Sequence, residues 1–492
     1  MCSGMLTRLL LVVYWIAAGT TSWATEAAKP NILFILCDDL GINDLHCYGR
    51  QDHHTANLDK LAAQGVKFTS AYCAQPICSP SRAAILTGKA PARLHLTTYL
   101  PGRPDCATQK LLHPEIQMQV PLEQRMIPWH LKKAGYVSGA FGKWHVGGQG
   151  FGPLEHGFDF YHPGQPNTKP SATEGGKGEY DLTAAAIKFI QTNRDRPFFV
   201  YLAHNSPHIP YSAQNERVEK NAKAFEPVYA GLIETLDDTV GRLLSELERL
   251  NLSEQTIVIF TSDNGGLHVP EGPHKRITHN TPYRAGKGFV YEGGLRIPLI
   301  VRWPGHVPRG KVVDEPIINT DWLPTLLELV GALAPSDLDG VSFANCLLGN
   351  GAPPRRSLFW HFPHYTNQGS RPSGAMREDR WMLVEYYDEE KTELYDLASD
   401  PGERSNAAAR HPEQVAKMRV ALAAWRKGLD AQENRPNPDF DPLKARPLYV
   451  DVDASRFDPA KASDAQWLKM WNWRKEMNAA VAESKRGKKA NP

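Results

Sequence analysis

Three short apolar runs along the chain end abruptly in polar residues. Residues 31–37, 197–203 and 256–261 are almost continuously apolar, which is typical of parallel strands buried on both faces. The polar stretches that follow them are Asp38-Asp39, His204-Asn205-Ser206-Pro207-His208 and Ser262-Asp263-Asn264-Gly265-Gly266. The pattern predicts three central strands that each end in potential ligands or catalytic groups.

Helical patterns separate these runs. Residues 228–250 carry apolar side chains every three or four positions, and residues 122–134 show a shorter pattern of the same kind. Strands that alternate with helices predict an α/β fold with a large mixed, mostly parallel sheet sandwiched by helices. In such folds ligands bind beyond the carboxyl ends of the strands. We therefore expect a functional site where the polar stretches meet.

The pattern of predicted elements changes after residue 348. Residues 349–354 (Gly-Asn-Gly-Ala-Pro-Pro) read as a linker, and the short strand patterns 381–384 and 393–397 are followed by a helical pattern at 411–428. These features predict a smaller α+β C-terminal domain and a polar tail with one helical stretch, about residues 465–482. The predicted division is a signal peptide at 1–24, a catalytic domain at 25–348, the C-terminal domain at 349–446 and the tail at 447–492.

The first residues resemble an export signal. Arg8 is the only charged residue among the first 24, an apolar run spans residues 9–18, and small residues end at Ser22-Trp23-Ala24. We expect cleavage after Ala24 and a periplasmic or secreted protein; the alternative is an uncleaved anchor. No later segment approaches about 18 consecutive apolar residues, so we expect no membrane span after cleavage. Six cysteines then remain, enough for one or two disulfides but too few for a disulfide scaffold.

Composition adds little beyond this. The 492 residues are 41% hydrophobic and 22% charged, as is ordinary for a globular protein. The formal net charge of +2 argues against a nucleic-acid partner, and the basic residues 485–489 are expected to be a solvated end.

The acids and the amide at two strand ends are candidate metal ligands. Asp38, Asp39, Asp263 and Asn264 offer hard oxygen atoms, which suit Ca²⁺ or Mg²⁺ better than zinc. Adjacent carboxylates repel each other unless a cation lies between them. Each pair alone could instead cap a helix or fill a turn.

A second candidate is the run Cys78-Ser79-Pro80-Ser81-Arg82. Pro80 suits the first turn of a helix, where free backbone N–H groups would meet an oxyanion. Arg82 would add a permanent positive charge. The alternative is a buried or disulfide-linked cysteine beside a surface arginine.

This run resembles the signature of type I sulfatases, the formylglycine-dependent, arylsulfatase-like members of the alkaline phosphatase superfamily. In that signature Cys-x-Pro-Ser-Arg is followed by Leu-Thr-Gly, here Leu86-Thr87-Gly88. Further segments resemble the family in the same order between about residues 30 and 410. They are Gly142-Lys143-Trp144-His145, Pro207-His208-Ile209-Pro210, Ser262-Asp263-Asn264-Gly265-Gly266, Gly286-Lys287 with Glu292-Gly293-Gly294, Asp321-Trp322-Leu323-Pro324-Thr325-Leu326 and Leu394-Tyr395-Asp396-Leu397.

The resemblance implies a role for each matched residue. Cys78 would be converted to formylglycine by a formylglycine-generating or anaerobic sulfatase-maturating enzyme, and its hydrate would attack sulfur. A divalent metal, usually Ca²⁺ with Mg²⁺ as an alternative, would be held by Asp38, Asp39, Asp263, Asn264 and the residue made from Cys78. The remaining catalytic residues would be Arg82 supporting the nucleophile, Lys143 and Lys287 clamping the sulfate, His208 protonating the leaving alcohol, and His145 orienting the nucleophile.

The implied activity is hydrolysis of sulfate esters, with a sulfated polysaccharide or glycosaminoglycan fragment as the expected substrate. One rival is a phosphatase or phosphodiesterase of the same superfamily, but such enzymes use Ser or Thr and often two zinc ions with His ligands, whereas Cys78 stands in a formylglycine motif. The other rival is a catalytically inactive carbohydrate-binding or structural protein, which the filled catalytic positions argue against.

Overall fold

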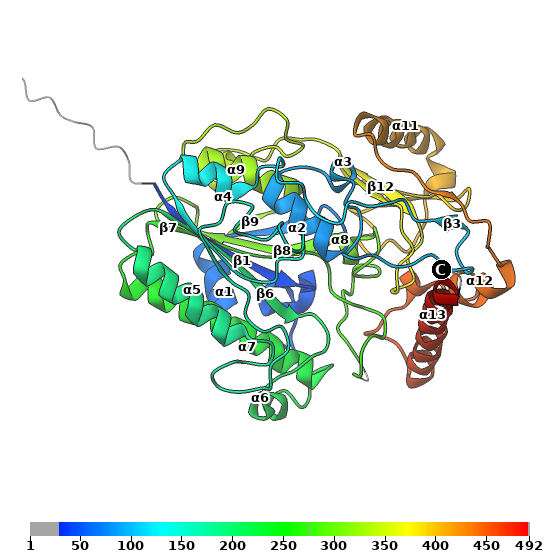
Figure 1. The fold of residues 1–492 in the computed structure, drawn as a ribbon, viewed down its shortest axis with the longest axis horizontal. Coiled ribbons are helices and arrows are strands. Elements are labelled where there is room, and N and C mark those ends of the chain that lie inside the picture. The colour runs from blue at the N-terminus through cyan, green and yellow to red at the C-terminus, as the bar shows by residue number, and fades with distance from the viewer. Residues whose placement is uncertain (1–28, 275, 491–492) are drawn as a thin grey trace, which may run out of the picture.

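A single large sheet dominates the structure, a computed structural model that describes residues 29–274 and 276–490 (Figure 1). Within these residues nine strands form this sheet, and β9 (Lys311–Val313) pairs only with β2. The order of the others is β10 (Ile317–Ile318), β2 (Val66–Tyr72), β8 (Arg296–Arg302), β7 (Thr256–Ser262), β1 (Asn31–Asp38), β6 (Phe198–Pro207), β4 (Val137–Gly142) and β5 (Phe160–His162). All pairings are parallel except the two made by β8.

Helices cover both faces of this sheet, as Figure 1 shows. One face carries α1 (Ala56–Gln64), α5 (Glu179–Asn193) and α7 (Pro227–Arg249), and the other carries α2 (Cys78–Thr87), α4 (Ile127–Lys133) and α9 (Trp322–Leu329). Helix α7 buries the apolar stripe that its sequence predicts, including Leu232, Leu236 and Leu243. The predicted α/β fold is confirmed.

Two element boundaries differ from the prediction. The helix expected at 122–134 begins only at Ile127, because Pro128 lies in its first turn, where the missing N–H costs no hydrogen bond. The strand expected at 197–203 continues to Pro207. The register of β6 against β1 shifts near this end, so that Asp38 lies opposite Pro207. This extension brings His208 close to the end of β1.

A four-stranded antiparallel sheet forms the smaller C-terminal unit. Its strands are β11 (Leu358–Phe362), β12 (Ser373–Glu378), β13 (Trp381–Tyr386) and β14 (Thr392–Asp396), and α11 (Pro412–Gly428) packs on it through Met418 and Leu422. Several further elements are short: α3 (Pro91–Leu94), α6 (Asn215–Lys220), α8 (Glu292–Leu295), α10 (Ala344–Leu347), and the strand pair β3 (Leu111–Leu112) and β15 (Arg435–Pro436).

The C-terminal tail, whose sequence is largely polar, buries several apolar side chains in the structure. Helices α12 (Pro442–Tyr449) and α13 (Asp464–Ala490) lie against the rest of the chain (Figure 1), and Trp467, Trp473 and Met477 of α13 belong to the main hydrophobic core. The Trp473 indole also donates to Leu448 O at 3.0 Å. The tail is therefore a packed part of the protein.

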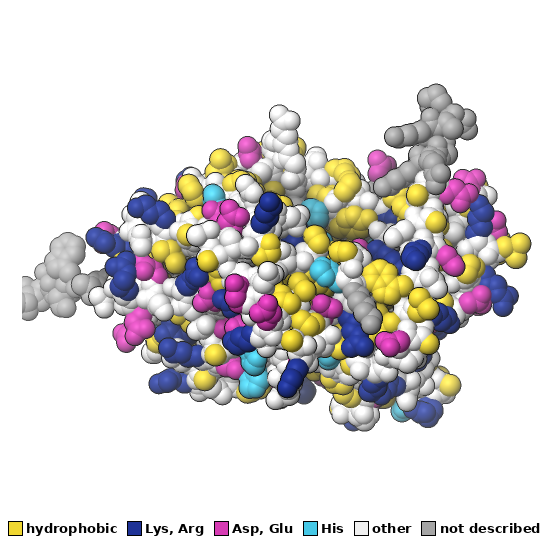
Figure 2. All heavy atoms as spheres, turned by 90° about the horizontal axis from the view of Figure 1, so that it is seen from below, with side chains coloured by type: hydrophobic (Ala, Val, Ile, Leu, Met, Phe, Trp, Pro, Cys, Tyr) yellow, Lys and Arg dark blue, Asp and Glu magenta, His cyan; other side chains and the backbone are white. Residues whose placement is uncertain are grey.

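Three further sequence expectations bear on the structure. The expected signal peptide, residues 1–24, lies outside the described residues. Among the residues that the structure covers, all six cysteines are free thiols and no helix is long and apolar enough to cross a membrane. On the face drawn in Figure 2, basic and acidic side chains are interspersed, in keeping with the small net charge.

Candidate active site

The predicted metal ligands meet where β1 and β7 end side by side. The backbone of Asp39 adopts a left-handed conformation (φ 67°), and its N–H donates to the carboxylate of Asp263 at 3.1 Å. The amide nitrogen of Asn264 donates to Asp39 Oδ1 at 2.8 Å. With Asp38, these four side chains are almost completely buried and form one polar cluster at this edge of the sheet.

Helix α2 delivers Cys78 and Arg82 to the same place. Cys78 is the first helical residue and is 3% exposed. One turn later, the buried guanidinium of Arg82 donates to Asp263 Oδ2 at 2.8 Å and to Lys143 O at 3.0 Å, and it lies 3.7 Å from Asp38. Arg82 therefore fixes the start of α2 against both strand ends.

Two lysines approach the cluster from different loops. Lys143 follows β4, where Gly142 has a φ of 89° and a Cβ would lie 2.1 Å from Ala203 O, so that only glycine fits. The Lys143 ammonium donates to Asp38 Oδ2 at 2.6 Å, and that of Lys287 donates to Asp39 Oδ2 at 2.7 Å. Both ammonium groups thus lie beside the carboxylates and near Cys78.

The two predicted catalytic histidines complete the constellation. The side chain of His208 is about one-third exposed, and its Nε2 lies 3.6 Å from Asp39 Oδ2. The Nε2 atom of His145 lies 2.9 Å from Leu100 O, and its other ring nitrogen is buried. All the predicted site residues therefore converge, although they come from six separate stretches of chain.

The electrostatics of this cluster favour negative charge at position 78. Burial alone would raise the pKa of the Cys78 thiol, but the cationic groups beside it, Lys143 and His145 foremost, lower that pKa to about 5. The helix N-terminus adds to the effect. Burial also opposes ionisation of Asp38, yet Lys143 and His208 hold its pKa well below the usual range. The site is built to stabilise an anion next to residue 78.

Comparison with known proteins identifies the family. The family model described as Sulfatase matches residues 30–332, and the model described as N-sulphoglucosamine sulphohydrolase, C-terminal, matches residues 285–427. The chain belongs to the sulfatase family. It is a sulfuric ester hydrolase, and the resemblance of its sequence motifs to those of type I sulfatases is confirmed.

Similar proteins cover most of this sulfatase. The dog N-acetylgalactosamine-6-sulfatase is 34% identical over 462 residues, 81% of this chain and 84% of its own. Human arylsulfatase A is also 34% identical, over 77% of this chain and 83% of its own. The solved structure of Ps i-CgsB in complex with k-i-k-neocarrahexaose is 28% identical with a TM-score of 0.71, and it covers 81% of this chain and 93% of that chain.

The sulfatase has oxygen atoms that fit a hard cation. Asp38 Oδ1 and Asn264 Oδ1 are buried and accept no hydrogen bond from any described residue. Carboxylate oxygens of Asp38 and Asp39 and a ring nitrogen of His208 also lie within 4.8 Å of one another. Buried acceptors without donors are costly unless a cation satisfies them, and the carboxylate and amide oxygens among these atoms suit Ca²⁺ or Mg²⁺.

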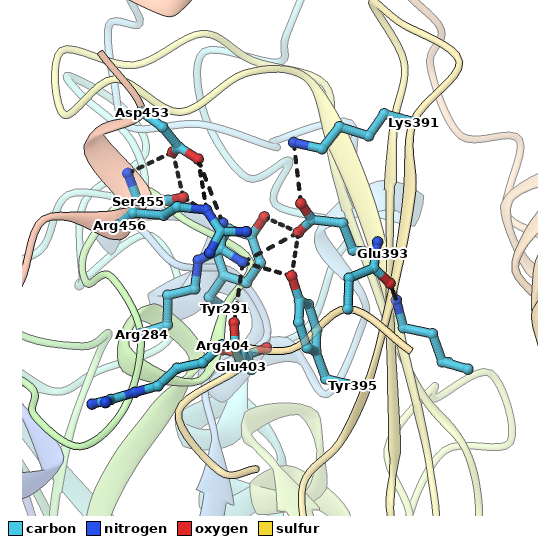
Figure 3. Close-up of polar contacts among 12 residues, drawn as sticks. Arg284, Tyr291, Lys391, Glu393, Tyr395, Glu403, Arg404, Asp453, Ser455 and Arg456 are labelled. Atoms are coloured by element: carbon cyan, nitrogen blue, oxygen red, sulfur yellow. Dashed lines mark hydrogen bonds and ion pairs between the residues drawn. The ribbon is translucent and has the colours of Figure 1, made fainter. Parts of the chain in front are cut away.

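One buried residue that supports the site was not found from the sequence. Arg284, three positions before Lys287, inserts between the C-terminal sheet and the tail (Figure 3). It donates to Tyr395 Oη at 2.8 Å, Glu393 at 3.2 Å and Ser455 Oγ at 2.7 Å. Its guanidinium also lies 3.7 Å from the ring centroid of Tyr291. The loop that carries Lys287 is thereby tied to the C-terminal unit, through contacts that no local sequence pattern signals.

Proposed function

We propose that this sulfatase hydrolyses sulfate esters of sulfated carbohydrates and releases inorganic sulfate. The observation that supports this proposal most strongly is the convergence of Arg82, Lys143 and Lys287 on the buried Cys78 beside three carboxylates. The names of similar proteins supply the substrate class, since they include an N-acetylgalactosamine-6-sulfatase and a complex with a neocarrahexaose. Polysaccharide or glycosaminoglycan fragments are the expected substrates.

The side chains of this site can act on such an ester in a defined order. Lys143 and Lys287 would bind the sulfate oxygens and neutralise their charge as sulfur is attacked, which is the preorganised electrostatic contribution common in such sites. Arg82 would hold the nucleophile, and His145 would orient it. His208, whose Nε2 faces Asp39 from the partly exposed side of the cluster, would protonate the leaving alcohol.

Two groups would complete this chemistry. A divalent cation, Ca²⁺ or Mg²⁺, held by Asp38, Asp39, Asp263, Asn264 and the residue derived from Cys78, would supply further positive charge for the sulfate. Conversion of Cys78 to formylglycine by a maturating enzyme would supply a hydrated aldehyde, whose second hydroxyl allows sulfate to be released. We further propose export through residues 1–24 to the periplasm or the exterior, and the domain division predicted from the sequence.

Sulfate release from a panel of position-defined sulfated sugars tests the substrate class. We expect turnover of at least one member, such as 6-sulfated N-acetylgalactosamine, and much slower release of phosphate from the matching phosphate esters. Faster hydrolysis of the phosphate esters would instead favour a phosphoesterase of the same fold. The mass of the peptide that contains Cys78, isolated from the native host, tests the modification: an unmodified thiol would contradict it.

A further inference from the structure

A glycine-rich loop packs tightly on the segment that follows His208. A Cβ on Gly176 would lie 1.7 Å from Ser212 O, so the two backbones are in direct contact. The loop continues into α5, whose first residue, Glu179, is fully buried. The conformation of residues 208–212 therefore depends on this loop.

Glu179 anchors the loop to the end of β6. Its carboxylate accepts from the backbone N–H groups of Gly176 at 2.9 Å and Lys177 at 2.8 Å, and from the hydroxyl of Ser206. Ser206 precedes His208 by two residues. The loop is thus fixed to the strand on the N-terminal side of the histidine.

Lys177 makes the corresponding contact on the C-terminal side of His208. Its ammonium donates to Pro210 O at 3.1 Å and to Asn167 Oδ1 at 2.9 Å. The residue is 2% exposed, and no carboxylate lies within ion-pair distance of it among the described residues. Burial lowers the pKa of this ammonium, and the carboxylates of Asp38 and Glu179 offset that cost only in part, so a stability role alone explains the residue poorly.

The position of the His208 ring follows from the backbone that Lys177 holds. His208 Nδ1 donates to the carbonyl of Ile209 at 2.7 Å, which leaves Nε2 directed toward Asp39. The next carbonyl, that of Pro210, is the one that accepts from Lys177, and the following N–H, that of Tyr211, donates to His274 Nε2 at 3.0 Å. Displacement of the Pro210 carbonyl would therefore turn the Ile209 carbonyl and the imidazole together.

We infer that Lys177 is a positioning residue for His208, holding the Pro210 carbonyl so that the imidazole reaches the leaving-group oxygen. The inference rests on the proposed function, in which His208 is the acid. Lys177 acts through the backbone and does not touch the substrate.

The dependence of rate on the leaving group separates this role from a general structural one. A sugar alkoxide needs a proton to leave, whereas an acidic phenol such as 4-nitrophenol does not. We expect Lys177→Met to slow hydrolysis of a sugar sulfate by about 100-fold, the lower end of what a positioned acid contributes. It should slow an activated aryl sulfate by only a few-fold. His208→Ala should show the same selectivity, and the double variant should lose little more.

Controls keep the result interpretable. Lys177→Gln retains a polar side chain too short to reach Pro210, and it is measured in parallel in case the methionine disturbs folding. Lys220→Met, which removes an exposed lysine paired with Glu234 at 2.5 Å, should leave both rates unchanged.

Equal losses on both substrates, or no loss on either, would overturn the inference. Absence of leaving-group selectivity in His208→Ala would instead overturn the proposed role of the histidine, and a wild type inactive on every sulfate ester would overturn the proposed function.

Discussion

Replacing Lys287 by methionine removes one of the two ammonium groups that we propose bind the sulfate. Lys287 is 6% exposed, and its Nζ lies 2.7 Å from Asp39 Oδ2, so methionine preserves most of the side-chain volume while the charge is lost. The substitution tests whether this lysine serves the reaction or only the folded state.

The substitution should have two effects of estimable size, a loss of catalytic rate and a loss of folding stability. Loss of one preorganised donor to a developing oxyanion typically costs about 2.7–4 kcal/mol, or about 10²–10³ in kcat. Loss of one partner of a buried ion pair destabilises a protein by about 3–5 kcal/mol, because Asp39 remains buried. Bound metal would reduce the second effect, since a cation beside Asp39 replaces part of the missing charge.

Sulfate release and unfolding by urea are measured with and without Ca²⁺. We expect kcat and kcat/KM to fall together by about 10²–10³, because the interaction strengthens in the transition state. The matched control is Lys89→Met, which removes a lysine paired with Asp337 at 2.5 Å just beyond the other end of α2, about 15 Å from Cys78 along the helix axis. Activity of Lys287→Met within three-fold of wild type would refute the assigned role.

Three further predictions concern the supports and charges of the site. Arg284→Met should lower the free energy of unfolding by about 3–5 kcal/mol and reduce activity by loosening the Lys287 loop; an unchanged urea midpoint would contradict this. Removal of metal with a chelator should abolish sulfate release, and Ca²⁺ or Mg²⁺ should restore it and raise the melting temperature, because the cation binds only the folded state; full activity after exhaustive chelation would oppose a metal role. In metal-free, unmodified protein the Cys78 thiol, whose pKa burial raises but Lys143 and His145 lower to about 5, should form thiolate as the pH rises through that value. Lys143→Met should move this midpoint upward, whereas a midpoint near the ordinary value of 9 would contradict the charge distribution.

Much of the fold could be predicted because its signals are local. The apolar run that forms β1 and the periodic stripe of α7 follow from burial on two faces or on one. Adjacent acids after a buried strand also pointed to Asp38 and Asp39 as candidate metal ligands, although such a pair can instead cap a helix or fill a turn. Sequence patterns predict best those features that depend on residues close together along the chain.

The missed features arise from contacts between distant parts of the chain. Lys177 and Pro210 meet only because a loop folds back over the end of β6, and no periodicity encodes that approach. Arg284 gains its partners from β14 and from the segment before α13, more than 100 residues away. The buried apolar face of α13 could not be predicted from the sequence because charged residues lie between its tryptophans and methionines.

The central claim is that Cys78 provides the nucleophile for sulfate-ester hydrolysis, and one comparison tests it most directly. Sulfate release by the matured wild type and by Cys78→Ala is measured on the same sugar sulfate, with the folded state of both verified by thermal unfolding. The account predicts turnover by the wild type and none above background by the variant. Equal rates for the two proteins would contradict it.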